Sequence, residues 1–258
     1  MKEVYSHSRL WLYENCPEYY KIKYIDRNCP TFPINDSLFL GSLVHDSLEW
    51  LYYQVKNREV TIQDLIEDYT EKWSKKYSEN IRFLKGNAKS KFNQGVKFLV
   101  DYYVKNKPFK DNTIEIEKRI LFPLDNENKY FIQGYIDRLV FNDKNEYEIH
   151  DYKTNQIMKK KEELDSDRQL GLYHLGLKEL FGKNIQVKLF WHFLAFNKLV
   201  GSERSQEQLD TLKNETLKLI KKIKETTYWP SCNKKWCDWC EYKRENNFTY
   251  ENFMKINS

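Results

Sequence analysis

The stretch that decides the fold is GYIDRLVFNDKNEYEIHDYKT, residues 134–154. Apolar and polar residues alternate over residues 130–141 and again over residues 146–152, with the period of two that marks half-buried strands. The tetrapeptide 142–145, Asn-Asp-Lys-Asn, is rich in turn-forming residues and predicts that the two strands form a hairpin. If the turn is centred between Asp143 and Lys144, Asp137 lies beside His150 and within one residue of Asp151.

The hairpin gathers charged side chains near the ends of its strands. Asp151 and Lys153 are two residues apart, so both side chains leave the same face of the strand. Two carboxylates held close repel each other unless a cation lies between them, and Mg²⁺ or Mn²⁺ is the natural one for oxygen ligands. Lys153 could then position or deprotonate a water, or stabilise charge on a phosphate. This arrangement favours phosphodiester cleavage; the alternative is an exposed ion-pair ladder that contributes little energy.

His45 is a further candidate ligand. It follows Gly41 by one helical turn in a segment, residues 37–56, that we expect to be helical. Gly41 leaves room there for another backbone or a ligand. A lone histidine on a helix is more often a packing residue than a ligand, so the assignment of His45 as a ligand depends on the other motifs that accompany it.

The rest of the chain predicts helices first, a sheet in the middle and a cysteine-bearing tail. Helices are expected at residues 6–24 with a break at Pro17, at 37–56 and, as a pair, at 62–106. Strands at 113–122 and 185–196 join those of the hairpin, and helices follow at 167–181 and 206–226. The fold class is therefore mixed α and β. We expect one domain over residues 1–258, with a mainly helical region (1–110), a core sheet with its helix (111–200) and a C-terminal helix and tail (201–258).

Composition describes an ordinary soluble protein, with 40% hydrophobic and 31% charged residues. No apolar run is long enough to span a membrane and the start carries no signal-like stretch, so we expect a cytoplasmic protein without a membrane partner. The net charge of +5 permits a polyanionic partner without requiring one. No phosphate-binding glycine motif is present, which argues against a nucleotide-driven motor.

Several blocks resemble, in order, the PD-(D/E)XK nuclease superfamily and within it the RecB-like exonuclease branch, which includes the AddB nuclease domain and the CRISPR-adaptation nucleases. The resemblance covers nearly the whole chain and implies a restriction-endonuclease-like core sheet flanked by helices. The blocks that carry it are Ser6-x-Ser8-x-x-x-x-Tyr13-x-x-Cys16-Pro17-x-x-Tyr20, Gly41-x-x-x-His45, Gly134-x-x-Asp137, Asp151-Tyr152-Lys153-Thr154 and Gln169-Leu170-x-x-Tyr173.

This resemblance implies roles for individual residues. His45, Asp137, Asp151 and the backbone carbonyl of Tyr152 would hold a magnesium or manganese ion, and the imidazole tilts the preference toward manganese. Lys153 would orient or activate the attacking water. Gln169 and Tyr173 would brace the site or contact DNA, with plain helix packing as the alternative. Glu117 would be a further catalytic acid, although Glu115 lies on the same strand face and could replace it.

The cysteines suggest a second metal site. Some members of the branch carry a [4Fe–4S] cluster, to which Cys16 and the pair Cys237-x-x-Cys240 would correspond. The family's last cysteine is replaced here by Asn246, and Cys232 could complete the set of four thiolates. A zinc ion or free buried thiols are the alternatives, and Cys29 has no partner in this scheme.

The resemblance implies a metal-dependent deoxyribonuclease, an exonuclease on single-stranded DNA ends that acts in recombination, repair or replication, alone or beside a helicase. The competing hypothesis is an inactive nuclease-like module that binds DNA or a helicase. Inactive relatives normally lose an acid or the lysine, and here His45, Asp137, Asp151 and Lys153 are all present, which favours activity. A third hypothesis, a small cysteine-metal nucleic-acid binder, leaves the hairpin and His45 unexplained.

Overall fold

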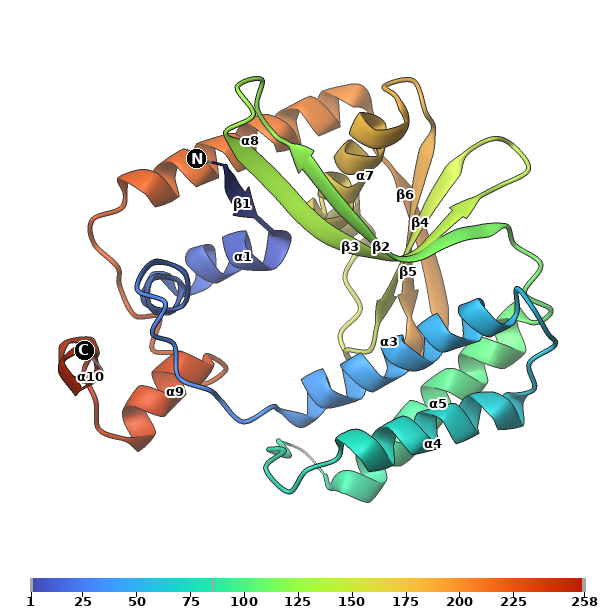
Figure 1. Cartoon of the computed structure of the whole chain (residues 1–258), viewed down its shortest axis with the longest axis horizontal. Helices are drawn as coiled ribbons and strands as arrows, with labels where there is room; N and C mark the ends of the chain where they lie inside the picture. Colours follow the sequence, from blue (N-terminus) through green and yellow to red (C-terminus); the bar gives the residue numbers. More distant parts are fainter. Residues whose placement is uncertain (1, 85, 257–258) are drawn as a thin grey trace. The chain divides into compact units, whose positions relative to one another are not determined.

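The computed structural model describes residues 2–84 and 86–256, and Figure 1 shows its helices and strands. The helices are α1 (His7–Asn15), α2 (Pro17–Tyr20), a π-helical turn (Lys21–Ile25), α3 (Asp36–Gln54), α4 (Ile62–Lys76), α5 (Ala88–Asn106), α6 (Lys161–Asp165), α7 (Arg168–Phe181), a 3₁₀ turn (Leu194–Phe196), α8 (Gln206–Glu225), α9 (Asp238–Glu245) and α10 (Tyr250–Ile256). The strands are β1 (Glu3–Tyr5), β2 (Thr113–Pro123), β3 (Tyr130–Phe141), β4 (Tyr147–Lys153), β5 (Val187–Phe193) and β6 (Lys198–Glu203). The expected order of helices, sheet and tail is confirmed, with β1, α6, β6, α9 and α10 as additions to it. The strand expected at residues 185–196 is shorter, because the 3₁₀ turn begins at Leu194.

The chain divides into two compact units. Unit 1 comprises residues 1–32, 123–132 and 210–258, and unit 2 comprises residues 33–122 and 133–209. Whether they act as one domain stays a prediction.

In unit 2, the helices α3, α4 and α5 pack on one another, and α5 contacts the 3₁₀ turn that follows β5 (Figure 1). Each begins at a polar cap: Asn35 for α3, Thr61 for α4 and Asn87 for α5 accept hydrogen bonds from the first backbone N–H groups of their helices. Their apolar sides form a core that includes Leu43, Leu48 and the ring of Tyr152 from β4. The long helix α3, which carries His45, is thereby fixed against the sheet.

The sheet of unit 2 has the order β3–β4–β5–β6, with β2 also paired to β3. β4 runs antiparallel to β3 and parallel to β5, and β5 runs antiparallel to β6. Helix α7 packs on β4 and β5 and ends at Gly182, whose N–H donates to the carbonyl of Lys178. Gly182 is the C-cap of α7, and its φ of 113° suits glycine.

The register of the β3–β4 hairpin corrects the sequence-based prediction by one residue. Arg138, not Asp137, pairs with His150. The cause is the loop: Asn142 N–H donates to the carbonyl of Glu146, and Asn145 adopts a φ of 61°, so the loop is centred on Lys144 and has an odd number of residues. A shift of one residue exchanges the faces of a strand. The observed register therefore places Asp137 and Asp151 on the same face, which the predicted register would not have done.

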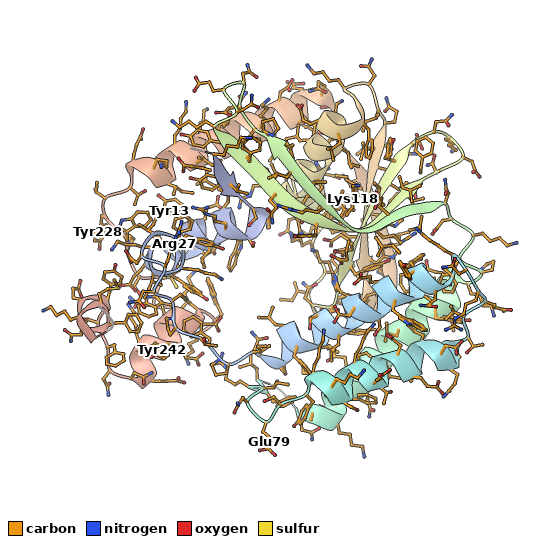
Figure 2. The ribbon with its side chains drawn as sticks, viewed as in Figure 1. Tyr13, Arg27, Glu79, Lys118, Tyr228 and Tyr242 are labelled. Atoms are coloured by element: carbon orange, nitrogen blue, oxygen red, sulfur yellow. The ribbon has the colours of Figure 1, made fainter. Side chains whose placement is uncertain are left out.

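Unit 1 has a small core of its own, built around Ile22, Trp239 and Phe253 with the cysteines. β1 runs parallel to the first residues of β3, with Glu3 opposite Tyr130. The break after α1 falls at Cys16, as expected from Pro17. Figure 2 labels Tyr13 and Tyr242 of this unit; the hydroxyl of Tyr13 lies 2.6 Å from that of Thr226.

None of the described helices is both long and apolar enough to cross a membrane.

Candidate active site

His45, Glu117 and Asp137 come together from three elements of unit 2, α3, β2 and β3. Each offers one ligand atom, and these atoms all lie within 4.8 Å of one another. His45 Nδ1 is 3.4 Å from Asp137 Oδ2, and His45 Nε2 is 2.9 Å from the backbone carbonyl oxygen of Tyr152. The backbone N–H of Tyr152 donates to Asp137 Oδ2 at 2.8 Å. The backbone of Tyr152 thus contacts both His45 and Asp137.

Glu117 reaches this group through an irregularity in β2. Its φ is 48°, in the left-handed region that residues with side chains rarely adopt. Glu115, two residues earlier, instead pairs with Lys118 at 2.7 Å. Of the two acids considered from the sequence, Glu117 is therefore the one placed beside His45 and Asp137.

Asp151 and Lys153 form a buried ion pair next to this group. Lys153 Nζ lies 2.7 Å from Asp151 Oδ2, and Asp151 is 3% exposed. Asp151 is not among the three residues whose ligand atoms lie within 4.8 Å of one another, and its role as a metal ligand stays a prediction.

Gln169 and Tyr173, both on α7, brace the lysine. Lys153 Nζ donates to Gln169 Oε1 at 3.0 Å, and Gln169 Nε2 donates to the hydroxyl of Tyr173 at 3.2 Å. The ring of Tyr173 lies against Gly134, where an added Cβ would stand 2.3 Å from Cε1 of the ring. The glycine of the Gly134-x-x-Asp137 motif is explained by this close packing.

Several carboxyl groups of the site are buried close together, which disfavours their charged forms. Burial, followed by the nearby carboxylate of Asp137, raises the pKa of Glu117 to about 7. Burial also raises the pKa of Asp151 to about 6, although Lys153 opposes this. Burial alone would lower the pKa of His45, but Asp137 outweighs it and raises that pKa to about 9. The crowded acids therefore favour a cation among them.

Lys153 is held in its charged form. Burial would lower its pKa, but the attraction of Asp151 outweighs burial and the pKa is raised. An ammonium group can donate hydrogen bonds and stabilise negative charge, whereas it has no lone pair with which to accept a proton.

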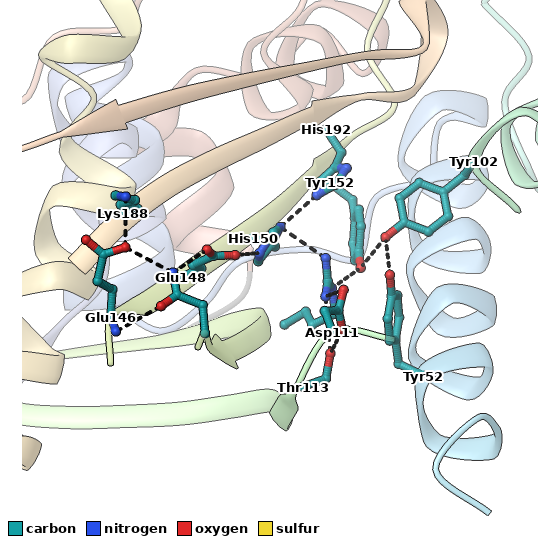
Figure 3. A network of polar contacts seen from close by, with 12 residues as sticks. Tyr52, Tyr102, Asp111, Thr113, Glu146, Glu148, His150, Tyr152, Lys188 and His192 are labelled. Atoms are coloured by element: carbon teal, nitrogen blue, oxygen red, sulfur yellow. Dashed lines mark hydrogen bonds and ion pairs between the residues drawn. The ribbon is translucent and has the colours of Figure 1, made fainter. Parts of the chain in front are cut away.

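Behind the site lies a polar network that sequence reasoning missed (Figure 3). Arg138 is 2% exposed; it donates to the hydroxyl of Tyr152 at 3.1 Å and to Asp111 at 2.6 Å, and its guanidinium lies 4.2 Å from the ring centre of Tyr52. The hydroxyl groups of Tyr102 and Tyr52 are 2.7 Å apart, and Tyr52 is on the same helix as His45. The alternation of strand β3, which points Arg138 away from the face of Asp137, was the available signal.

The second candidate metal centre lies in unit 1. Ligand atoms of Cys16, Cys232, Cys237 and Cys240 all lie within 4.8 Å of one another. Cys29 is a free, half-buried thiol and is not one of this group. Four cysteines this close could bind a metal.

The comparisons with known proteins concern the family and the fold. A model of the PD-(D/E)XK nuclease superfamily matches residues 4–244. Among solved structures, a proposed exonuclease from Eubacterium rectale is 12% identical, with a TM-score of 0.55, and the match covers 93% of this chain and 87% of that one. This likeness shows a shared fold.

A second solved structure, SSO0001, is 15% identical over 92% of this chain and 95% of its own, but its TM-score of 0.36 is too low to support an argument. No curated protein sequence matches significantly. The RecB-like branch stays a prediction, while the mixed α/β class with a helix-flanked sheet is confirmed. Since the family model spans nearly the whole described chain, this protein belongs to the PD-(D/E)XK nuclease superfamily.

Proposed function

We propose that this protein is a divalent-metal-dependent DNA nuclease that degrades single-stranded DNA from its ends, in recombination, repair or replication. The observation that carries the proposal is the convergence of His45, Glu117 and Asp137 beside the buried Asp151–Lys153 pair. The exonuclease assignment of the similar protein from Eubacterium rectale supports the same class of reaction.

The donor set fits a divalent cation. Two carboxylates and one imidazole offer ligand atoms within 4.8 Å of one another. Burial, followed by the charge of Asp137, raises the pKa of Glu117, and a cation beside these acids would favour their charged forms. An imidazole among oxygen ligands suits Mn²⁺ better than Mg²⁺. When bound, such an ion polarises a phosphate oxygen and lowers the pKa of a bound water.

The backbone of Tyr152 would orient the ligands. When His45 Nε2 carries the proton, it donates to the carbonyl of Tyr152, and Nδ1 presents its lone pair on the side of Asp137. The carbonyl of Tyr152 then orients the imidazole, and the direct ligand role that the resemblance implied for this carbonyl stays a prediction. The N–H of Tyr152 fixes one oxygen of Asp137 in the same way.

Lys153 would act as a charged group. Its ammonium is held between Asp151 and Gln169, both within 3.0 Å. Because its pKa is raised, it would hold the attacking water by donating a hydrogen bond, or stabilise the charge that develops on the phosphate. Gln169 and Tyr173 would keep the ammonium in place.

A groove beside the site supports a single-stranded substrate. Its volume is about 980 Å³, and it is lined by Thr154–Ile157, which follow Lys153, and by the first turns of α3. Leu38 and Ile157 in its wall are 63% and 75% exposed. Among the described lining residues the one basic side chain, Lys91, is paired with the buried Asp36 at 3.1 Å. Such a groove suits the apolar faces of unpaired bases better than phosphates, and a duplex hides those faces.

The experiment that tests the activity uses linear and circular single-stranded DNA with Mn²⁺, with and without chelator. We expect cleavage of the linear substrate alone, abolished by chelator and lowered at least about 100-fold by Asp151→Asn or Lys153→Met. Lys75→Met, which removes an exposed lysine paired with Glu71, is the matched control and should retain activity. If the protein binds DNA without cleaving it, the result supports the inactive nuclease-like module instead. If it cleaves the circular DNA, the result contradicts the exonuclease assignment.

The groove is tested separately with the double variant Leu38→Ser, Ile157→Ser. We expect KM for a single-stranded oligonucleotide to rise about 10-fold, equivalent to about 1.4 kcal/mol, while hydrolysis of a small phosphodiester such as bis(p-nitrophenyl) phosphate is unchanged. An equal effect on both substrates, or on neither, would contradict a role of the groove in binding the strand.

A further inference from the structure

The cysteine cluster of unit 1 takes no part in the proposed reaction, and its geometry identifies the kind of metal it would hold. Cys16 Sγ lies 3.8 Å from Cys240 Sγ, and Cys232 Sγ lies 3.6 Å from the same atom. With Cys237 included, all four sulfur atoms lie within 4.8 Å of one another.

These separations match a single tetrahedral ion. Zinc–thiolate bonds of about 2.3 Å place the sulfur atoms of a tetrahedral site about 3.8 Å apart. A [4Fe–4S] cluster instead binds each thiolate to a different iron at the corners of a cube, which spreads the sulfur atoms to roughly 6 Å. No pair among these four cysteines is that far apart. The four-iron group that the resemblance implies therefore does not fit the observed spacing.

The ligand set also departs from the expected pattern in sequence. Asn246 stands where the last cysteine was expected, and Cys232 supplies the fourth sulfur from the segment before α9. Cys232 and Cys237 are both close to Cys240, so three ligands come from nine consecutive residues.

The surroundings are arranged to accept thiolates. Cys237 is the residue that precedes the helix α9, whose first backbone N–H groups have no partner within the helix.

Further donors and apolar cover complete the surroundings. The hydroxyl of Ser231 lies 3.2 Å from Cys240 Sγ, and Lys243 Nζ donates to that hydroxyl at 3.1 Å, which brings a positive charge near the sulfurs. Ile22, Trp239 and Phe253 cover the cluster with apolar surface.

We propose that Cys16, Cys232, Cys237 and Cys240 bind one zinc ion tetrahedrally, and that this site holds no iron–sulfur cluster. The ion joins the start of the chain to its C-terminal segment within unit 1. All four positions of the tetrahedron are taken by protein ligands, so the site is structural.

The test is metal analysis of the full chain purified anaerobically without added metal. We expect about one zinc per chain, negligible iron and no absorbance band at about 400 nm. Replacement of zinc by Co²⁺ should give the intense visible bands of tetrahedral cobalt thiolate. About four irons with acid-labile sulfide, or no stoichiometric metal at all, would overturn the proposal.

Two further measurements identify the ligands. X-ray absorption at the zinc edge of the wild-type protein should show four sulfur atoms at about 2.3 Å from the zinc ion. A nitrogen or oxygen atom among the four nearest neighbours of the zinc would show that one of the four cysteines is not a ligand. Cys232→Ser should lower zinc affinity at least about 100-fold, whereas the matched Cys29→Ser should keep it. Equal zinc affinity in the two variants would exclude Cys232 as a ligand. None of these readouts depends on nuclease activity, so the two proposals fail independently.

Discussion

Glu117 is held in a backbone conformation that costs energy. Its φ of 48° lies in the left-handed region, where a residue with a side chain pays about 1 kcal/mol or more. The same irregularity brings its carboxylate beside His45 and Asp137, where burial raises its pKa to about 7. We therefore propose that Glu117 serves the chemistry of the site rather than stability.

We therefore expect Glu117→Gly to separate stability from metal binding. Glycine relieves the backbone and removes a crowded acid, so the free energy of unfolding in urea should stay equal or rise by about 1 kcal/mol. Affinity for Mn²⁺, measured by calorimetric titration, should fall. Glu115→Gly is the matched control on the same strand; it should lower stability and leave Mn²⁺ affinity unchanged. Wild-type Mn²⁺ affinity in Glu117→Gly would show that this acid is not a ligand.

Gly134 depends on the ring of Tyr173. A methyl group at residue 134 would meet that ring at 2.3 Å, and Tyr173 is buried, so Gly134→Ala should cost about 1–3 kcal/mol of unfolding free energy. The measurement is a double-mutant cycle by urea denaturation. In the background of Tyr173→Ala the same substitution should cost close to nothing. An equal cost in both backgrounds would mean that the strand, rather than the ring, forbids a side chain.

At the scale of elements, the sequence predicted most helices and strands because their patterns are long and periodic. The hairpin, the helix α3 and the break at Pro17 all follow from local residues. The strand β1 has three residues and β6 has six, too few for a period to stand out above the loops around them. The register error came from Asn145, whose positive φ adds one residue to the loop and cannot be read from composition alone.

The site was predictable in its membership and less so in its contacts. His45, Asp137 and Lys153 stand in motifs, whereas the double contact of the Tyr152 backbone depends on how α3 lies against the hairpin. The alternation of β3 places Arg138 on the face away from Asp137, but its partners are distant in sequence and cannot be read from a local pattern. Long-range packing, rather than residue type, was the missing information.

The buried face of α7 carries a histidine that should make the protein sensitive to acid. Burial, followed by the charges of Lys178 and Arg204, lowers the pKa of His174 to about 4, and its Nδ1 has no hydrogen-bond partner among the described residues. Below a pH of about 6.5, His174 takes up a proton in the unfolded chain, whereas in the folded protein it stays neutral until the pH approaches about 4. This residue therefore subtracts stability as the pH falls toward about 4, by up to about 1.4 kcal/mol per pH unit.

His174→Leu removes this penalty without losing a hydrogen bond. Urea denaturation of both proteins at pH 7.5 and pH 5.0 should show the variant gaining about 2 kcal/mol relative to wild type at the lower pH. Comparison of the two proteins cancels the opposite contributions of Glu117 and Asp151, whose pKa values are raised. If the stability difference does not change with pH, His174 is protonated at pH 5.0 in the folded protein as in the unfolded chain, and folding does not lower its pKa.

At the scale of the whole molecule, the two proposed sites fall in different units. The proposed nuclease residues all lie in unit 2, and the four clustered cysteines all lie in unit 1. The sequence could not reveal this division, because unit 1 is assembled from three separate segments of the chain. Each unit also has its own buried apolar cluster. Zinc binding should therefore stabilise one unit far more than the other.

Hydrogen exchange with and without the metal tests this division. Removal of zinc by chelator, or by Cys240→Ser, should raise amide exchange at least about 10-fold in α2, α9 and α10, whose packing includes the cysteines. Exchange in α3 and β4, which carry His45 and Lys153, should stay within about twofold of the metal-bound protein. Cys29→Ser, whose thiol lies outside the cluster, is the control and should leave both sets unchanged. Equal loss of protection in α3 and α9 would mean that the two units unfold together, and that the metal supports the proposed catalytic residues as well as the tail.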